Sequence, residues 1–563
     1  MSVRAVTGTR VVLLAVRISE ATRENLLGFA FGIVNNGQVN WLRGRKVFRS
    51  VIPNPDPKAD FSTAEQPVQS LIWADYTATP GTKTTYRVAP VYGPVGALRV
   101  GPAIDIEVQT EDPEKGRHGI YFNRGAIASQ AFSEDFQNKP PKDPDDPKDP
   151  TVRWLSRGML DAALAFIKKA KAGDRLHVAA YEFTYTPILL ALKDAAASGV
   201  DVQIVYEAGK GRDRKTGKIV DTSATTSARK AISALQLDSQ KGLTLIKRTK
   251  RRNIPHNKFI VWVRGEKSAE VLAGSANFTA SGFCGQTNVV HIVRDPTIAD
   301  DYLAYWNELA QDPTTPDLST WSQARTPQDQ MTGLLSKPAV VPYFSPRKND
   351  AMLSWYADRI AEAEETVMFT AAFGVNKLLA AQFGIDRPFV RFVLLEDEPD
   401  ADLRAKLSQD RDVMSAFGSL LGAYTGKKKT FPVSDLDKWF LKEELYRKEG
   451  NIFFIHTKFL LTDPLSDNPL VCTGSANFST SSLEANDENM FLIRGDTAVA
   501  DIYLTEFDRI FRHFYARQEI NRRLEKGLPV VEAKFLEEDN GWLDGYVKLG
   551  RLKTNRQRLF FPD

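Results

Sequence analysis

A block of polar and apolar residues occurs twice in this chain, and no other feature constrains its fold as strongly. The first copy reads HNKFIV at 256–261 and GSANFT at 274–279. The second reads HTKFLL at 456–461 and GSANFS at 474–479, at a constant offset of 200 residues. Chance does not repeat so many polar identities in one register, and a long internal repeat indicates a duplicated structural unit. We therefore predict two copies of one lobe in a single chain.

Helices and strands alternate around both copies. Ahead of the first copy, apolar spacing predicts a helix that ends at Gly173, a strand at 176–181, a helix at 187–197 and a buried strand at 200–206. The same order restarts near Met352. Such alternation is typical of α/β domains. We predict an α/β fold of two tandem α-β-α lobes, at 152–335 and 336–530, related by a pseudo-two-fold axis.

The first 112 residues follow a different pattern. Alternating apolar residues at 27–33, and the Thr- and Tyr-rich stretch 84–92 after a Thr-Pro-Gly turn, have the period of two that predicts strands. Strands separated by turns, with no helical period, favour a β-sandwich. The stretch around Tyr86 resembles the penultimate strand of a fibronectin type III module. No cluster of titratable residues suited to chemistry occurs here, so we interpret 1–112 as an accessory domain that binds or stabilises.

Two further segments complete the predicted organisation. Residues 113–151 are expected to connect the sandwich to the first lobe, and five prolines within 140–150 exclude a helix there. The part from His118 to Phe136 fits neither sandwich nor linker and is expected to pack on the following lobe. The C-terminal residues 531–563 form a basic tail in which cations alternate with Leu and Phe. A docked tail and a binding arm fit this pattern equally well.

Composition excludes several classes of protein. The chain has 563 residues and a formal net charge of +4, from 74 Lys+Arg against 70 Asp+Glu, which is too small to name a partner. Two cysteines cannot build a disulfide framework. No run of about 18 apolar residues predicts a membrane span, and residues 11–16 are too short for the core of a signal peptide. We expect a soluble protein that is cytoplasmic or exported without a cleavable signal.

The spacing within the repeat predicts a paired chemical site. A His and a Lys two residues apart on a strand point to the same face, and Gly-Ser-x-Asn ends the next predicted strand. If the lobes face each other, eight side chains converge: His256, Lys258, Ser275 and Asn277 from one lobe, and His456, Lys458, Ser475 and Asn477 from the other. This set suits an anionic tetrahedral centre, because one His can attack, the other can protonate a leaving oxygen, and the remaining groups can stabilise charge.

The duplicated HxK…GSxN pattern resembles the phospholipase D superfamily, whose motif is HxKxxxxD followed by GSxN or GGxN. The second copy matches in full, with Asp463 five residues after Lys458, whereas the first has Val263 there. The family uses this Asp mostly for structure. The resemblance covers about 152–530 and implies phosphodiester cleavage in two steps through a phosphohistidine, without metal or cofactor. By the same resemblance His256 is the nucleophile and His456 the general acid.

A carboxylate downstream of GSxN orients a histidine in this family. Glu488 fits that position, but in the same register the first lobe has Asn288. Because a carboxylate raises the basicity of an imidazole more than an amide does, the two histidines should differ. The sequence leaves open which histidine Glu488 faces. The other four histidines (118, 177, 291 and 513) are expected to be structural, and Cys284 and Cys472 to be buried apolar residues.

Charge runs bear on the substrate. The cations of 247–252 end four residues before His256 and are expected to rim the site, and 210–218 and Lys427–Lys429 add further cations. A basic rim favours a polyanion, which is either a nucleic acid or an anionic lipid surface.

Three functions stay open. The leading hypothesis is a phospholipase D that cleaves glycerophospholipid head groups at a membrane surface, with transphosphatidylation as a related activity. The alternative is a nuclease of the same superfamily that cuts DNA or RNA, because GSANF is similar to the nuclease branch. A binding protein with a decayed site is disfavoured by the intact motif residues, and cardiolipin-synthase-like transferases by the missing membrane segments. Both half-sites lie in one chain, so we expect a monomer.

Overall fold

The computed structural model describes most of the chain. The described residues are 1–56, 59–125, 132, 135–137, 139, 141–212, 216–397, 399–418, 454–525, 527, 534–547 and 551–561. The cations Arg214, Lys215 and Lys427–Lys429, expected near the site, lie outside these residues.

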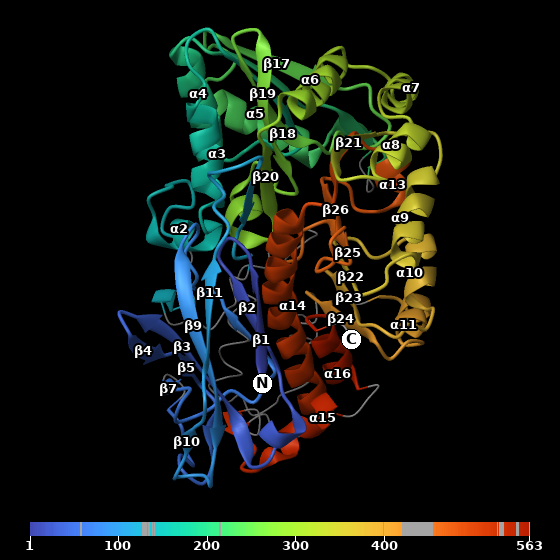
Figure 1. The fold of residues 1–563 in the computed structure, drawn as a ribbon. Helices are drawn as coiled ribbons and strands as arrows, with labels where there is room; N and C mark the ends of the chain where they lie inside the picture. The colour runs from blue at the N-terminus through green and yellow to red at the C-terminus, as the bar shows by residue number, and fades with distance from the viewer. Residues whose placement is uncertain are drawn as a thin grey trace.

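Each lobe is built on a seven-stranded sheet (Figure 1). In lobe 1 the strand order is β12 (His118–Phe122), β20 (Val289–Val293), β19 (Lys267–Gly274), β18 (Lys258–Arg264), β13 (Arg175–Ala180), β14 (Asp201–Glu207) and β17 (Leu243–Arg248). In lobe 2 it is β21 (Ala339–Ser345), β27 (Glu488–Arg494), β26 (Leu470–Gly474), β25 (Phe459–Thr462), β22 (Val367–Ala371), β23 (Arg391–Leu395) and β24 (Val413–Phe417). The orders match strand for strand, so the duplicated α/β lobe is confirmed.

Helices cover both faces of each sheet. The outer face of lobe 1 packs on α3 (Met159–Lys168), α4 (Thr186–Ala197) and α5 (Ser223–Ala234), and that of lobe 2 on α9 (Ala351–Ala361), α10 (Lys377–Phe383) and α11 (Ala401–Leu407). The inner faces share one apolar core with α6 (Pro296–Ala310) and α14 (Thr497–Glu525). Because this core belongs to both sheets, the lobes form one packed unit rather than two tethered domains.

The backbone joins the lobes through two equivalent hydrogen bonds. The amide of Thr287 donates to the carbonyl of Phe454 (2.6 Å), and the amide of Asp487 donates to the carbonyl of Ile254 (3.1 Å). Each pair is converted into the other by the offset of 200 residues. The loops that precede the two motif histidines are therefore held by the opposite lobe in the same way.

The N-terminal region contains two antiparallel sheets, as its alternating pattern predicts. One comprises β1 (Ser2–Thr7), β2 (Val12–Arg17) and β8 (Ile72–Asp75). The other comprises β10 (Arg99–Val100), β9 (Lys83–Tyr92), β3 (Leu26–Asn35) and β4 (Gln38–Trp41), with β11 (Ile104–Gln109) also paired to β9. Apolar side chains from both sheets form one core, as in a β-sandwich. Likeness to a fibronectin type III module remains a prediction.

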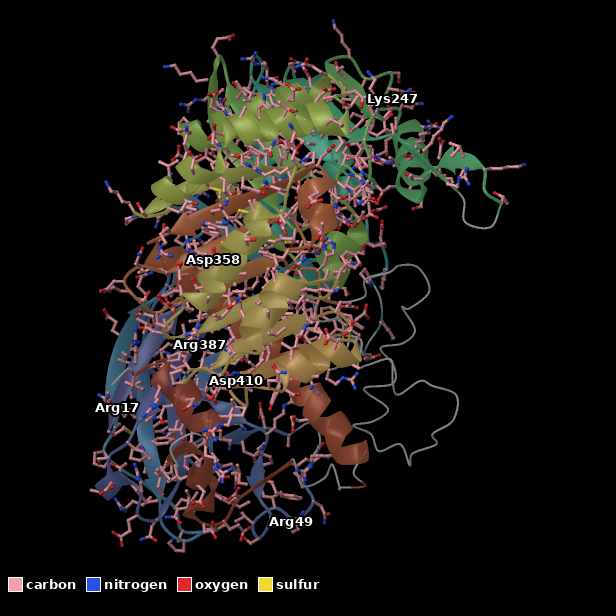
Figure 2. The ribbon with its side chains drawn as sticks, turned by 90° about the vertical axis from the view of Figure 1, so that its right-hand side faces the viewer. Arg17, Arg49, Lys247, Asp358, Arg387 and Asp410 are labelled. Atoms are coloured by element: carbon pink, nitrogen blue, oxygen red, sulfur yellow. The ribbon has the colours of Figure 1, made fainter. Side chains whose placement is uncertain are left out.

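The sandwich is fixed to the lobes through α14. Val6, Leu13 and Ala74 from its three-stranded sheet belong to the core that α14 shares with both lobes. The approach is close, because a Cβ added at Gly8 would lie 2.1 Å from the hydroxyl oxygen of Thr505. Figure 1 shows α14 between this sheet and the strands of lobe 2. In the side view of Figure 2, Arg17 and Arg49 of the sandwich lie far from Lys247 of lobe 1.

One predicted boundary needs correction. Strand β12 lies in the predicted connecting segment 113–151, within the part that we expected to pack on the following lobe, and it pairs with β20 at the edge of the lobe-1 sheet. It occupies the place that β21 takes in lobe 2. Its five residues are too few to signal a sheet edge when the partner strand lies more than 160 residues away. The helix α2 (Pro150–Ser156) then begins at the last proline of the linker.

The C-terminal tail is docked. Strand β28 (Phe535–Leu536) pairs with β6 (Val47–Phe48) of the N-terminal region. The indole of Trp542 is buried in the sandwich core and donates to the carbonyl of Leu26 (3.0 Å). The guanidinium of Arg4 donates to the carbonyl of Phe560 (2.9 Å). Of the two readings of this tail, the described residues support the docked one.

Several short elements complete the fold. They are β5 (Arg43–Gly44), β7 (Phe61–Ser62), β15 (Lys210–Arg212), β16 (Ile219–Asp221), α7 (Thr315–Arg325), α8 (Gln328–Leu334), α13 (Thr480–Glu484), α15 (Asp544–Val547) and α16 (Leu552–Arg558). Among the helices that the structure describes, none has both the length and the apolarity needed to cross a membrane.

Candidate active site

The two HxK segments lie at equivalent strand starts and have the same local geometry. Lys258 is the first residue of β18, and Lys458 directly precedes β25. Each ammonium donates to the carbonyl oxygen of the histidine two residues before it, at 2.5 Å in lobe 1 and 2.6 Å in lobe 2. All four side chains are buried: no more than 4% of His256 or His456 is exposed, and no more than 1% of either lysine. The structure thus brings both predicted pairs into the interior between the lobes.

The glycine of each GSxN segment allows two strand ends to approach closely. At Gly274 an added Cβ would lie 2.1 Å from the carbonyl oxygen of Val289, and at Gly474 it would lie 2.3 Å from that of Asn489. The following serine amides donate to the same two carbonyls, at 3.1 Å and 2.9 Å. Only glycine fits these positions, which explains why the motif requires it.

Each motif histidine is oriented by the opposite lobe. The Nδ1 atom of His256 lies 2.9 Å from Oε2 and 3.0 Å from Oε1 of Glu488 on β27. Asn486 donates to Oε1 of the same carboxylate at 2.9 Å and so fixes its orientation. The sequence left open which histidine Glu488 faces, and the structure assigns it to His256.

His456 has an amide in the corresponding place. Its Nδ1 lies 2.9 Å from Oδ1 of Asn288. The Nδ2 group of Asn288 donates to the carbonyl of Gly282 (2.9 Å), so Oδ1 must be the atom turned toward the imidazole. A carbonyl oxygen only accepts hydrogen bonds, and Nδ1 of His456 therefore carries the proton. Its Nε2 is therefore the ring nitrogen without a proton in the neutral form.

Burial sets the protonation of the first pair. It raises the pKa of Glu488 to about 7, although Lys258 and the hydrogen bonds from Ser475 and Asn486 oppose this shift. Burial also lowers the pKa of His256 well below its ordinary value, and the charges of Lys258 and Lys458 act in the same direction. The imidazole is consequently neutral near pH 7 and holds a lone pair on Nε2, which is the form a nucleophile needs.

The same environment affects His456 and the lysines. Burial, followed by the charges of Lys458 and Lys258, lowers the pKa of His456 well below its usual value. Burial lowers the pKa of Lys258 to about 7, while Glu488 and Glu182 counteract it. It also lowers the pKa of Lys458, with Lys258 as a second cause. Burial and mutual repulsion thus disfavour the charged forms of these four groups, and an entering anion would favour them.

The motif serines, which we predicted among the catalytic residues as neutral donors, are hydrogen-bonded within the protein. Ser275 donates to Oδ1 of Asn288 (2.8 Å) and accepts from the amide of Val289 (3.1 Å). The hydroxyl of Ser475 donates to the carbonyl of Asn489 (3.3 Å) and accepts from its amide (3.0 Å). Their part in the reaction remains a prediction.

The motif asparagines lie at the site, and one has an unpredicted partner. The amide of Asn277 donates to the carboxylate of Glu182. Burial raises the pKa of Glu182, while Lys258 and Asn277 lower it. The Oδ1 atoms of Asn277 and Asn477 are buried and have no hydrogen-bond partner among the described residues. These two oxygens mark equivalent unsatisfied positions in the two half-sites.

Tyr181 and Glu182 are site residues that sequence reasoning missed. They directly follow β13, and the ring of Tyr181 lies 5.3 Å from that of His256, centroid to centroid. Their position directly after a buried strand is a sequence signal that could have identified them as site residues. In lobe 2 the strand register places Ala372 and Phe373 in these positions. The two half-sites therefore differ in these positions as well as in the residue that contacts the histidine, which is Glu488 for one and Asn288 for the other.

The motif Asp has a replacement in lobe 1. In lobe 2 the carboxylate of Asp463 accepts from the backbone amides of 364–366, at 2.7–3.2 Å. In lobe 1 Val263 is buried at that position, but Asp174 on the neighbouring strand end accepts from the amide of Gly265 and the indole of Trp262 (3.0 and 3.1 Å). Both carboxylates therefore join the equivalent pair of strand ends, but Asp463 follows the later strand, β25, whereas Asp174 precedes the earlier strand, β13.

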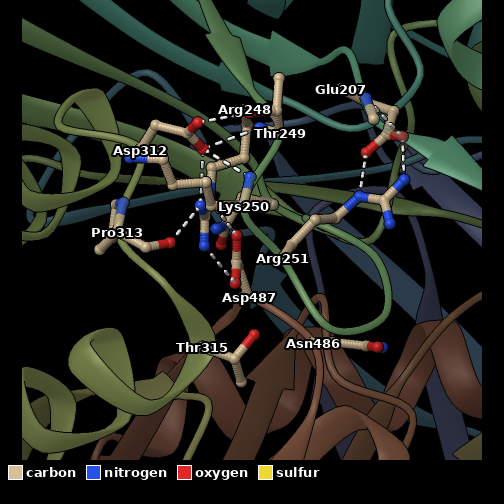
Figure 3. Close-up of polar contacts among 12 residues, drawn as sticks. Glu207, Arg248, Thr249, Lys250, Arg251, Asp312, Pro313, Thr315, Asn486 and Asp487 are labelled. Carbon is tan, nitrogen blue, oxygen red and sulfur yellow. Dashed lines mark hydrogen bonds and ion pairs between the residues drawn. The ribbon is translucent and has the colours of Figure 1, made fainter.

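Two of the five cations in the run 247–252, Arg248 and Arg251, do not form the rim we expected. Arg248 is fully buried and is paired with Asp487 of lobe 2 (2.9 Å) and Asp312 (2.8 Å), as Figure 3 shows. Arg251 is paired with Glu207. Burial lowers the pKa of Arg248, but its two carboxylate partners more than compensate and raise it overall. Arg248 thus joins the lobes, while Lys250 and Arg252 stay exposed.

Other candidate groups lie away from the site. His118 and His291 bond to each other (2.8 Å), and His177 packs on Trp306. Cys284 and Cys472 are buried and free. Within the described residues, no group of three or more His, Cys, Asp or Glu side chains is arranged to hold a metal ion.

Comparison with known proteins supports the same assignment. A family model described as "Cardiolipin synthase, PLD-like domain" matches residues 164–310 and 433–511, which include both HxK and both GSxN segments. No curated protein sequence matches the chain.

Several solved structures are similar to parts of the chain. Phosphatidylserine synthase from Haemophilus influenzae is 13% identical over 67% of this chain and 92% of its own, with a TM-score of 0.39. Nuc, a phospholipase D family member from Salmonella typhimurium, is 26% identical over 27% and 86% (TM-score 0.21). Polyphosphate kinase from Porphyromonas gingivalis is 12% identical over 61% and only 46% (TM-score 0.35). Scores below 0.5 do not establish a common overall arrangement.

The family match covers the duplicated motif, and the structure places both copies of that motif in one buried site between two matching lobes. Over the two matched segments the chain is similar to the PLD-like domain of the phospholipase D superfamily, whose members act on phosphodiesters.

Proposed function

We propose that the chain is a phosphodiesterase that works through a phosphohistidine and needs no metal. The observation that carries this proposal is the pairing of His256 with Glu488 and of His456 with Asn288 across the lobes. In the first step Nε2 of His256 attacks phosphorus, an N–P bond forms and the bond to the leaving oxygen breaks. His456 gives its Nε2 proton to that oxygen. Lys258 and Lys458 stabilise charge on the non-bridging oxygens.

The protonation of His456 follows from substrate binding. Its pKa is low in the empty, positively charged site. A bound phosphodiester adds a negative charge between the two lysines, which raises the pKa of the imidazole and favours the acid form. In the second step the neutral His456 takes a proton from water, and the oxygen of this water displaces His256 from phosphorus. An alcohol in place of water would give transphosphatidylation.

The position of the carboxylate supports a nucleophile in lobe 1. As the N–P bond forms, positive charge develops on His256, and ionised Glu488 stabilises it through Nδ1. The amide of Asn288 orients His456 but carries no charge to stabilise an imidazolium, so its proton is lost more readily. A better base on one side and a better acid on the other is the arrangement that two-step cleavage requires.

The test is to trap the intermediate. His256→Ala and His456→Ala should each abolish hydrolysis of bis(p-nitrophenyl) phosphate, and a chelator should leave the wild-type rate unchanged. With bis(p-nitrophenyl) phosphate, which has a good leaving group, His456→Asn should accumulate the remaining p-nitrophenyl phosphoryl group on His256, detected by mass spectrometry of peptides. An adduct on His456 in a His256 variant would reverse the two roles, and loss of activity in chelator would refute the metal-independent step.

For the substrate we propose a glycerophospholipid first. Phe373, which replaces Glu182 at the lobe-2 side of the site, is 58% exposed, and Leu378 on the following helix is 38% exposed. Apolar side chains beside a phosphodiester site suit the boundary between head group and acyl chain, because one side of such a substrate is apolar. The sandwich is packed on α14, and we propose that it stabilises the lobes.

A nucleic acid is the second candidate. Lys210, Arg212 and Lys247 are exposed at the lobe-1 sheet edge where β14 and β17 end and β18 begins. Cations at such an edge would contact the phosphates of a strand. Turnover of phosphatidylcholine vesicles and of single- and double-stranded DNA, compared at two salt concentrations, decides between the candidates. We also propose that the active form is a monomer, because one chain supplies both half-sites.

A further inference from the structure

A second basic pocket lies at the lobe junction, outside the paired histidine site. Its volume is about 580 Å³. We define the pocket by its charged lining residues, which are Lys250, Arg251, Arg252, Arg347, Lys348 and Glu484. The first three come from the loop ahead of His256 and the others from lobe 2, so the pocket exists only when the lobes are packed together. Figure 3 shows the loop with Lys250 and Arg251 beside Thr315, which also lines the pocket.

Three cations of this pocket have no acidic partner. Lys250, Arg252 and Lys348 are exposed, and no carboxylate within the described part of the chain pairs with them. Arg251 differs, because Glu207 neutralises it. The carboxylate of Glu484 is the single negative charge in the lining. Like charges gathered in one concavity raise the local concentration of anions.

Arg347 is the strongest sign of a built site. Only 5% of this residue is exposed, and its guanidinium donates to backbone carbonyls of Phe344 and Ser322 (3.1 and 3.3 Å) and to Thr326. Across the described residues no carboxylate contacts it, and its Nη1 group makes no hydrogen bond. Burial lowers the pKa of Arg347. A buried cation without a counter-charge is costly, and an anion in the pocket would supply that charge.

A buried hydroxyl in the lining is also unsatisfied. Ser319 on α7 is 4% exposed, and its Oγ has no hydrogen-bond partner in the part of the chain that the structure describes. Buried polar groups are nearly always bonded, so each exception calls for an explanation. Ser319 is such an exception in this cavity, and its hydroxyl can donate to an anion that Arg347 would also face.

The pocket continues toward the histidine site. A smaller cavity of about 320 Å³ shares Arg252 and Glu484 with it and is also lined by Asn253. The amide group of Asn253 donates to Oδ1 of Asn486 (2.5 Å). The Nδ2 group of Asn486 donates in turn to Oε1 of Glu488 (2.9 Å). Two hydrogen bonds thus separate this second cavity from the carboxylate that orients His256.

We propose that the basic pocket is a second anion site that binds a phosphate group other than the one being cleaved. Guanidinium groups match the paired oxygens of phosphate, and the volume leaves room for the residue that carries the phosphate. The group is either free inorganic phosphate or a non-scissile phosphate of a substrate with several phosphates. The second source rests on the proposed function, whereas binding of the free ion does not.

Titration calorimetry of the full chain with inorganic phosphate tests the site. Wild type should bind at two classes of site. Arg252→Gln combined with Lys348→Gln should weaken one class at least tenfold, and Lys258→Gln combined with Lys458→Gln should weaken the other. The matched control is Lys241→Gln with Lys267→Gln, which removes two exposed cations outside the pocket. Circular dichroism confirms folding, and the test pair alters only exposed side chains.

The outcomes separate the two hypotheses. If the Arg252 and Lys348 variant binds phosphate as the wild type does, or if the control loses as much affinity, the second anion site is refuted. If only the Lys258 and Lys458 variant is unaffected, the proposed catalytic site fails and the pocket stands. Arg347→Lys, which keeps the charge but not the planar fork, should weaken the same class as the exposed pair.

A kinetic comparison identifies the source of the phosphate. We compare kcat/KM for a thymidine tetranucleotide with that for bis(p-nitrophenyl) phosphate, which has a single phosphate. A tenfold fall of this ratio in the Arg252 and Lys348 variant assigns the pocket to a non-scissile phosphate of the substrate. An unchanged ratio, together with lost binding of inorganic phosphate, assigns it to the free ion.

Discussion

The imidazole Nδ1 of His256 lies 2.9 Å from a carboxylate oxygen of Glu488, and the two residues belong to different lobes. The equivalent contact of His456, with Asn288, also crosses between lobes. Neither lobe by itself therefore contains an oriented histidine. This relationship couples the proposed chemistry to the packing of the two sheets, because a small shift between lobes would misalign both rings.

Replacing Glu488 should slow the reaction without removing the site. Glu488→Gln keeps an acceptor for Nδ1 of His256 but loses the negative charge, and we expect kcat to fall about 10–100-fold, by analogy with the partners of metal-bound histidines. Asn288→Ala is the matched change in the other lobe and should mainly impair the His456 step. Steady-state and burst kinetics measure both effects. An unchanged kcat in Glu488→Gln would contradict the role of the carboxylate.

The pH profile of kcat/KM should be bell-shaped and narrow. Burial raises the pKa of Glu488 to about 7, so its ionised form is lost as the pH falls below that value. Burial lowers the pKa of Lys258 to about 7, so its charge is lost as the pH rises above it. Because kcat/KM reports the free enzyme, it should peak near pH 7 and decline on both sides. A profile that stays flat from pH 5 to 9 would exclude both assignments.

Glu488→Gln supplies the control for this profile. The amide does not titrate in this range, so the acidic limb should move to lower pH while the alkaline limb stays in place. An acidic limb that is unchanged in the variant would have to belong to another group. Lys258→Gln is expected to remove the alkaline limb instead.

The buried ion pair between the lobes should carry a large part of the stability. Arg248 and Asp487 are both fully buried, and Asp487→Asn leaves the guanidinium with Asp312 as its one carboxylate partner among the described residues. Removing one partner of a buried pair costs about 3–5 kcal/mol. Urea unfolding should show this loss in the free energy of unfolding. The double variant Arg248→Met with Asp487→Leu should recover part of this loss, because no fully buried charge is left and Asp312 keeps its hydrogen bonds from Thr249 and Lys250.

The two structural aspartates should be equivalent although they lie on different strands. Asp463→Ala and Asp174→Ala each remove an acceptor of several backbone or indole N–H groups, and each should cost about 1–3 kcal/mol. Val263→Asp introduces the aspartate of the HxKxxxxD motif in lobe 1, but Val263 is buried in the core shared by the lobes. It should therefore destabilise the chain rather than rescue Asp174→Ala. Thermal unfolding of the variants checks this, and a stabilising Val263→Asp would contradict it.

The sequence by itself determined the duplicated lobe and the residues of the site. A repeat in constant register specifies two lobes with the same strand order. Within each lobe, the positions of His, Lys, Gly, Ser and Asn follow from the geometry of two neighbouring strands, which depends on local sequence. The start of lobe 1 was harder to predict from the sequence, because β12 pairs with a strand that lies far along the chain. Tyr181 and Glu182 were missed because lobe 2 has no polar counterpart to repeat them.

Only the tertiary structure decided what crosses between the lobes. It decided which histidine Glu488 orients, that Arg248 is buried in an ion pair rather than exposed at a rim, and that Arg252 and Arg347 line one pocket. The physical reason is that these contacts depend on how two sheets rotate and approach each other, and the shared core around α6 and α14 sets that relation. No local periodicity encodes it.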